Sequence, residues 1–198
     1  MSDDRLERQI AFLTEADKLK TVLRRTPLSD GSRPENSAEH SWHLVLAAMT
    51  LAEYAPADLD LPRVLELLTV HDLVEIDAGD TFAYDAAGYE TKAARELAAA
   101  ERIFALLPAD QAARFRSRWD EFEAHDTLES KYANALDRFQ ALLQNMTSGG
   151  GSWKSHGITR VDVLRRMAPV QADLPQLWPF VVDVIDRFWE SGATGMKS

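Results

Sequence analysis

Four residues of types that commonly bind metals are spread along this chain of 198 residues: His40, His71, Asp72 and Asp137. Neutral imidazole and ionised carboxylate are natural nitrogen and oxygen ligands of a divalent cation. Each of the four stands in a segment with the apolar spacing of a helix. Because burying ionisable groups is costly unless something pairs them, a bound divalent cation would account for all four.

The central pair, His71-Asp72, lies in an apolar run that extends from Leu67 to Glu75. His71 and Glu75 are four positions apart, and Asp72 and Glu75 are three apart, so all three share one face of a helix. The alternative is a chance dipeptide in which His71 is a hydrogen-bonded core residue. The other candidate ligands around the pair favour the metal site.

His40 and Asp137 also lie on expected helices. His40 falls in the first turn of a helix that follows a polar segment beginning at Glu35. Asp137 stands beside an apolar stripe and needs a partner there, such as Arg138, Lys131 or a metal ion. His43 is three residues after His40 and could also approach a metal, but we expect it to pack behind the ligands.

The order His, then His-Asp, then Asp resembles the HD superfamily of metal-dependent phosphohydrolases. Within it, the chain is most similar to the small HD proteins that act as 5'-deoxyribonucleotidases. The stretches that carry the resemblance are Arg25-Thr26-Pro27-Leu28, Arg33-Pro34-Glu35-Asn36-Ser37-Ala38-Glu39-His40-Ser41, His71-Asp72-Leu73-Val74-Glu75-Ile76-Asp77-Ala78-Gly79-Asp80 and Leu136-Asp137-Arg138-Phe139. The resemblance implies an all-α HD-domain helical bundle.

The resemblance also implies a role for each matching residue. The four ligands would hold one divalent ion and leave positions open for water and a phosphate oxygen; they are His40, His71, Asp72 and Asp137. Glu75 matches the catalytic glutamate that handles a proton, and Arg25 matches an arginine that contacts the substrate phosphate. Asp80 matches an aspartate near the sugar, in preference to Asp77. Thr26 stands where some deoxynucleotidases have a tryptophan thought to help exclude the ribose 2'-hydroxyl, so the choice between ribose and deoxyribose stays open.

General chemistry points the same way. Phosphomonoester hydrolysis is among the slowest uncatalysed reactions, and a metal assists it by lowering the pKa of bound water from about 15.7 toward 7. Four protein ligands leave room for water only at five- or six-coordinate geometry. That geometry favours manganese, cobalt, iron or magnesium over tetrahedral structural zinc, and two histidines argue against magnesium as the tightest binder. A cation such as Arg25 suits the charge of the phosphate.

The composition suits a water-soluble enzyme. Hydrophobic residues make up 45% of the chain and charged residues 27%, and there is no cysteine for a disulfide or thiolate metal site. A net charge of -10 argues against duplex nucleic acid as a partner but permits a small nucleotide substrate. No run of about 20 apolar residues predicts a membrane span. We therefore expect a cytoplasmic enzyme, and we expect a homodimer.

The elements that must position these residues are predicted to be helices of one domain, residues 1–198, with its core at about 36–146 and the terminal helices packed on it. The expected helices are Leu6–Arg24, Ala38–Glu53, Pro62–Ile76, Lys92–Leu107, Pro108–His125, a helix around Asp137, Thr159–Met167 and Pro175–Glu190. An Asp77–Tyr89 loop after the ligand helix could cover substrate.

Two features toward the C-terminus allow more than one interpretation. Trp153 and His156 stand in a Gly-rich segment that borders the pocket or, as we favour, anchors the packing. An apolar stripe in the last helix is either core or a dimer surface. The stripe consists of Leu177, Phe180, Val181, Val184, Ile185 and Phe188.

Two other functions stay open. The chain could hydrolyse a nucleoside triphosphate, a cyclic dinucleotide or an alarmone, because one fold hosts several reactions. Glu90 after Gly88-Tyr89, where cyclic-dinucleotide enzymes have proline, and Ile76, where alarmone hydrolases have an acidic residue, count against the last two. The chain could instead be a non-catalytic regulator that binds nucleotide or metal, although the presence of Glu75 argues for an enzyme.

Overall fold

Helices account for most of the computed structural model, which describes residues 3–192. The elements in chain order are α1 (Asp3–Ala16), η1 (Asp17–Thr21), β1 (Leu23–Pro27), β2 (Pro34–Asn36), α2 (Ser37–Thr50), η2 (Ala52–Tyr54), α3 (Leu61–Val70), α4 (Glu75–Ala78), α5 (Ala86–Phe104), α6 (Ala109–Ala124), α7 (Leu128–Thr147), α8 (Gly151–His156), α9 (Arg160–Arg166), α10 (Ala168–Asp173), η3 (Pro175–Leu177) and α11 (Trp178–Glu190). The all-α class is confirmed, with one short antiparallel pair of strands, β1 and β2, in the described range.

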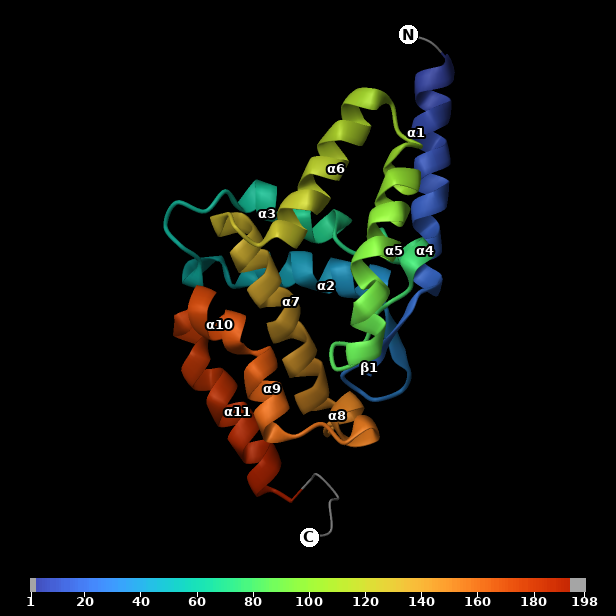
Figure 1. Cartoon of the computed structure of the whole chain (residues 1–198). Helices are drawn as coiled ribbons and strands as arrows, with labels where there is room; N and C mark the ends of the chain where they lie inside the picture. The colour runs from blue at the N-terminus through green and yellow to red at the C-terminus, as the bar shows by residue number, and fades with distance from the viewer. Residues whose placement is uncertain (1–2, 193–198) are drawn as a thin grey trace.

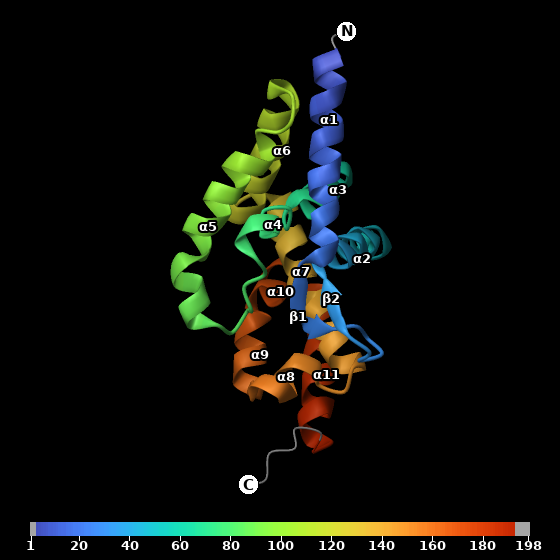
Figure 2. The ribbon, with the colours of Figure 1, turned by 90° about the vertical axis from the view of Figure 1, so that its right-hand side faces the viewer.

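Helix α7 lies at the centre of the fold, with α2 and α3 packed across it (Figure 1). Helices α5 and α6 extend together to one end of the molecule beside α1, while α9, α10 and α11 lie at the other end (Figure 1). After a quarter turn, the β1–β2 ribbon is seen between these two ends, near α7 and α8 (Figure 2). Segments far apart in the sequence therefore meet around the middle of α7.

Local sequence signals fix where the helices that carry the site begin. Asn36 caps α2 by accepting a hydrogen bond from the backbone of Glu39, whose side chain accepts one from the backbone of Asn36 in return. Asp60 caps α3, and Pro62 sits in its first turn. Thr127 and Ser130 form the same reciprocal cap on α7. These caps set the starting points from which His40 and Asp137 are positioned.

Four of the sequence-based boundaries are wrong. The first helix ends at Ala16, and the Arg24 end of its predicted range lies in β1, because that stretch pairs with β2. The predicted Pro62–Ile76 helix breaks after Val70, where hydrogen bonds to the third preceding residue replace the α-helical pattern. Helix α5 begins at Ala86, which shortens the predicted loop. The Gly-rich segment contains helix α8.

Two groups of buried side chains hold the bundle together. The larger surrounds α7 and includes Leu44, Leu68, Leu136 and Ile185. The smaller joins α1, α5 and α6 through residues such as Phe12 and Ile103 on either side of α4. The stripe of the last helix belongs to the larger core, because all of its members except Phe180, which is 45% exposed, are buried. No helix between residues 3 and 192 has the length and apolar character needed to cross a membrane.

Candidate metal and phosphate site

The four predicted ligands come together in the middle of the fold, from three different segments. His40 is in the first turn of α2, His71 and Asp72 are in the tight turn that follows α3, and Asp137 is halfway along α7. One ligand atom each from His40, His71 and Asp72 lies within 4.8 Å of the others, and all three residues are buried. Asp137 adjoins this group through His40, with Oδ1 2.9 Å from the imidazole Nε2.

The His71 ring is oriented by its own helix. Nδ1 lies 2.9 Å from the carbonyl oxygen of Leu68, so this nitrogen donates its proton there and Nε2 keeps a lone pair. Nε2 is buried and has no hydrogen-bond partner within residues 3–192, although Oδ1 of Asp72 is 3.1 Å away. Two acceptors facing each other at that distance need a cation between or beside them. Burial also lowers the pKa of His71, which favours the neutral form that binds metals.

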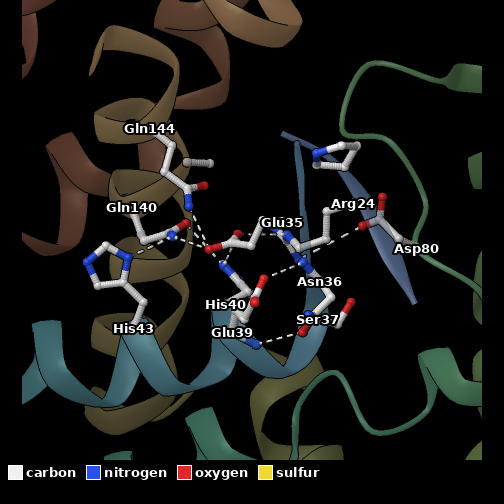
Figure 3. Close-up of polar contacts among 12 residues, drawn as sticks. Arg24, Glu35, Asn36, Ser37, Glu39, His40, His43, Asp80, Gln140 and Gln144 are labelled. Carbon is white, nitrogen blue, oxygen red and sulfur yellow. Dashed lines mark hydrogen bonds and ion pairs between the residues drawn. The ribbon is translucent and has the colours of Figure 1, made fainter. Parts of the chain in front are cut away.

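A chain of buried amides orients the His40 ring (Figure 3). Nδ1 of His40 lies 3.1 Å from Oε1 of Gln140, and Nε2 of that amide donates to Oε1 of Glu35 at 3.1 Å. Gln144 donates to the same carboxylate oxygen at 2.6 Å, and His43 contacts Gln140 from the other side. With Nδ1 directed at an amide oxygen, Nε2 faces the acidic cluster, which is the arrangement of a metal-bound histidine with a supporting partner.

The acidic neighbours of His40 determine its protonation. Burial and the charge of Arg24 act to lower the pKa of His40, but the contacts with Asp137 and Glu35 and the charge of Asp72 outweigh them and raise it to about 9. Burial opposes ionisation of Asp137, yet its hydrogen bond with His40 holds the pKa of that carboxyl well below its usual range. A proton on Nε2 therefore occupies the place that a metal would take, since metal binding displaces such protons.

Arg24 is a site residue that the sequence analysis missed. Its guanidinium reaches inward from β1 and lies 3.1 Å from Oδ2 of Asp72 and 4.0 Å from Asp137. Asp80 is 3.9 Å away on the side opposite Glu35 (Figure 3). Nε of Arg24 lies 3.5 Å from Oε2 of Glu35. Side chains alternate along a strand, so Arg25 is exposed at the rim of the cavity while Thr26 is buried in its wall.

Glu75 stands at the edge of the cluster on the first residue of α4. Its Oε2 accepts a hydrogen bond of 2.6 Å from the hydroxyl of Ser37, and both residues are buried. Burial and the nearby charge of Asp72 raise the pKa of Glu75 well above its usual value, so its carboxyl holds a proton more readily than an exposed glutamate does. Burial likewise raises the pKa of Asp80. Asp77, in contrast, points to the surface and pairs with Arg102.

A cavity of about 310 Å³ opens onto these groups. Its walls include Phe82 and Tyr84 from the segment before α5, Tyr89 from α5 itself, and the arginines Arg138 and Arg166. Its size suits a nucleotide-sized ligand, since pockets for small molecules begin at about 300 Å³. Burial first, and then the charge of Arg166, lower the pKa of Arg138.

The Gly-rich segment contributes one packing residue and one residue near the opening. Trp153 is 3% exposed and packs against Phe188 and Trp189, in line with the predicted packing role, and it also borders the cavity. His156 is exposed, and its ring lies against Phe82 with centroids 4.5 Å apart. α8 thus meets the segment that the sequence suggested as a cover.

In this helical bundle, one histidine, a His-Asp pair and an aspartate from a distant helix meet at one cavity. This combination of fold and residues indicates a metal-binding helical protein. The chain matches the family model described as HD domain over residues 16–178, and it belongs to that family. The predicted family is therefore confirmed.

Individual relatives agree with this assignment. The human protein named 5'-deoxynucleotidase HDDC2 is 31% identical over 136 residues, which are 68% of this chain and 65% of the human protein; the Xenopus laevis protein of the same name is 30% identical over 132 residues, or 64% of each chain. The chain thus spans somewhat less than two thirds of these relatives. A crystal structure titled as a predicted metal-dependent phosphohydrolase from Magnetospirillum magnetotacticum MS-1 is 46% identical, with a TM-score of 0.92 over 96% of both chains.

Proposed function

We propose that this protein is a metal-dependent phosphohydrolase that releases phosphate from nucleoside 5'-monophosphates. The observation that carries the proposal is the buried group of His40, His71 and Asp72, whose ligand atoms converge beside a cavity lined by arginines. The names of the relatives, 5'-deoxynucleotidase and metal-dependent phosphohydrolase, support the substrate class and the reaction.

The residues present fit a divalent ion. Both histidines direct Nε2 at the cluster because Nδ1 of each has an acceptor elsewhere, and the buried Nε2 of His71 has no hydrogen-bond partner among the described residues. We therefore propose His40, His71, Asp72 and Asp137 as the protein ligands of one ion. When bound, such an ion lowers the pKa of a water molecule and polarises a phosphoryl oxygen. Imidazole and carboxylate together suit manganese, cobalt, iron or zinc better than magnesium.

The chain's own residues would carry the proton and the charge of the substrate. Hydrolysis joins the oxygen of water to phosphorus, breaks the bond between phosphorus and the 5' oxygen, and delivers a proton to the leaving alcohol. Glu75 is our candidate for that proton transfer, with Ser37 holding its carboxyl in place through the 2.6 Å hydrogen bond. Arg24, directly beside the acidic cluster, and Arg25, at the rim, are the candidate partners of the phosphate.

The sugar would lie against Asp80 and Thr26. Asp80 lines the cavity close to Arg24, and its carboxylate can accept a hydrogen bond from a sugar hydroxyl. Thr26 is buried in the same wall and is smaller than tryptophan, so it leaves space where a 2'-hydroxyl would be placed. We propose that this enzyme accepts ribonucleotides more readily than an enzyme with tryptophan there. If Thr26→Trp does not raise the ratio of deoxyribo to ribo activity, that proposal is wrong.

The test of the reaction is phosphate release from a panel of deoxyribo- and ribonucleoside monophosphates, with triphosphates and a cyclic dinucleotide for comparison. Each substrate is assayed with manganese, cobalt, magnesium or a chelator. Release from monophosphates that the chelator abolishes supports the proposal. A protein that binds metal but releases phosphate from none of these compounds would refute it.

We also propose that the chain forms a homodimer and acts in the cytoplasm. Helix α2 carries exposed apolar side chains at positions 42, 46 and 49, on one face, and a second copy could cover them. The exposed fractions are 66% for Trp42, 45% for Leu46 and 56% for Met49. Light scattering of the purified protein, with Trp42→Glu as the disrupting variant, measures the oligomeric state.

A further inference from the structure

Arg138 and Arg166 form a pair of cations in the cavity that the proposed reaction does not use. Arg138 follows Asp137 on α7, and Arg166 is the last residue of α9. Nη1 of Arg138 donates to the backbone and side-chain oxygens of Asn134, at 2.7 and 3.1 Å. Among residues 3–192, no carboxylate lies within 4 Å of Arg138. Its remaining N–H groups are thus free to bind a ligand in the cavity that it lines.

Within residues 3–192, Asp137 is the one carboxylate less than 4 Å from Arg166, and Arg24 approaches the same carboxylate. Nη2 of Arg166 lies 3.8 Å from Oδ2 of Asp137, beyond hydrogen-bond distance, while Arg24 lies 4.0 Å from the other oxygen of the same carboxylate. Under the proposed function, Asp137 binds the metal ion, so its charge is neutralised by that ion. Among residues 3–192, neither Arg138 nor Arg166 then has a carboxylate within 4 Å that is not bound to the ion, and a bound anionic group would stabilise both cations.

The two pairs of arginines come from different elements. Arg24 and Arg25 belong to β1, whereas Arg138 and Arg166 come from α7 and α9. Arg24 and Arg166 approach different oxygens of the Asp137 carboxylate, at 4.0 and 3.8 Å, so the second pair lies beside the pair that is proposed to hold the first phosphate. The chain as a whole carries a net charge of -10, so two arginines gathered in one cavity are not explained by a generally basic surface.

We propose that Arg138 and Arg166 form a second anion subsite, and that the preferred substrate is a nucleotide with a second phosphate group besides the one that is removed. This inference rests on the proposed function for the position of the first phosphate. The second phosphate could be attached to the sugar, as in a nucleoside 3',5'-bisphosphate, where hydrolysis at the 5' position leaves it in place. In a nucleoside 5'-diphosphate, water would attack the terminal phosphorus, the bond from that phosphorus to the bridging oxygen would break, and the nucleoside 5'-monophosphate would leave with the proton. Both present the same chemistry to a pair of guanidinium groups.

The test compares deoxyadenosine 5'-monophosphate, deoxyadenosine 3',5'-bisphosphate and deoxyadenosine 5'-diphosphate as substrates of the metal-loaded enzyme. The readout is the ratio of kcat/KM for each two-phosphate compound to that for the monophosphate, which does not depend on the folded fraction of a variant. We expect a ratio of about ten or more for one of them in the natural protein, since a charge-assisted hydrogen-bonded pair readily supplies that factor. Which compound is preferred shows where the second phosphate is attached.

Variants assign the preference to the two arginines. Arg138→Gln and Arg166→Gln should each reduce the ratio at least about fivefold. Arg187→Gln, which removes the same charge from an arginine that is 77% exposed and paired with Asp183 on α11, should leave the ratio unchanged. The inference is overturned if neither two-phosphate compound is preferred, or if the preference survives in both cavity variants.

Equilibrium binding separates this inference from the proposed function. Calorimetry of the same three nucleotides with the manganese-loaded Glu75→Gln variant, whose turnover is expected to be slow, measures the subsite directly. Tighter binding of a two-phosphate compound that is lost in Arg138→Gln supports the subsite even if no phosphate is released from any substrate, a result that would refute the phosphohydrolase. If phosphate is released from monophosphates but all three compounds bind equally well, the phosphohydrolase is supported and the second anion subsite is refuted.

Discussion

Oε1 of Gln140 accepts a hydrogen bond from Nδ1 of His40 across 3.1 Å, although the two residues are 100 positions apart in the chain. This contact fixes the tautomer of a proposed metal ligand from the neighbouring helix. The amide nitrogen of Gln140 is held in turn by Glu35, so the orientation of the glutamine is determined as well.

Gln140→Leu should therefore weaken metal binding. Loss of a partner behind a metal-bound histidine typically costs about 10- to 100-fold in affinity, and we expect a loss in that range. Titration calorimetry with manganese measures it. Gln144→Leu is the matched control, because Gln144 also donates to Glu35 but does not contact His40. Equal losses in the two variants would show that the effect comes from Glu35 or from packing.

Glu75→Gln should separate catalysis from metal binding. Removing a proton-transfer group typically costs about 10²- to 10⁴-fold in rate, so kcat should fall by at least about 10²-fold. Metal content should stay at one ion per chain, because Glu75 is not among the proposed ligands. Asp77→Asn, a nearby surface carboxylate paired with Arg102, serves as the control and should retain full activity. A Glu75→Gln enzyme with more than a tenth of the natural rate would rule out this role.

Substitutions of Arg24 and Arg25 should have different effects on KM and kcat. Arg24 lies 3.1 Å from Asp72, whereas Arg25 is exposed at the rim, so Arg24→Lys should raise KM and lower kcat more than Arg25→Lys does. Lysine keeps the charge but loses the two-pronged geometry of the guanidinium. Steady-state kinetics on a nucleoside monophosphate measures both parameters. A larger effect at Arg25 would instead support the assignment that the resemblance implied.

Two independent features require a glycine at position 150, just before α8: its backbone conformation and its distance from a neighbouring side chain. Its φ is +102°, and a Cβ at this position would lie 2.4 Å from the ring of Phe188. Gly149→Ala is a matched control, since its φ is +68° but a Cβ there meets nothing within 4 Å. We expect about 1–2 kcal/mol of destabilisation for Gly149→Ala from backbone strain alone. Gly150→Ala should lose about 1–3 kcal/mol more through overpacking. Denaturant unfolding measures both, and equal losses would exclude the contact with Phe188.

The sequence was sufficient to predict the histidines and aspartates that can bind a metal ion, because their side-chain chemistry indicates that role. His40, His71 and Asp72 were predicted from ligand chemistry and helical spacing, and the structure brings them together. Asp137 was predicted beside an apolar stripe, but its partners are His40, Arg24 and Arg166 in place of its helical neighbours Arg138 and Lys131. Such contacts depend on how helices pack, which periodicity does not specify.

The residues that sequence reasoning missed act through tertiary contacts. In the sequence, nothing distinguishes Glu35 and Gln140 from other polar residues. In the fold, β2 and α7 place them behind the His40 ring. Arg24 was assigned to the end of a helix, and pairing of β1 with β2 overrides that local preference. The end of α3 at Val70 was also missed. Apolar residues keep a helical spacing from Leu61 to Glu75, so the sequence does not indicate the turn after Val70.

The most direct test of the account is phosphate release from a nucleoside 5'-monophosphate before chelation, after chelation and after manganese is restored. The account predicts that chelation abolishes release, that manganese restores it, and that His71→Ala remains inactive under all three conditions while keeping its helical fold. Phosphate release that persists at the original rate in the chelated protein would contradict the central claim that the histidines and aspartates around His71 hold a metal ion for the reaction.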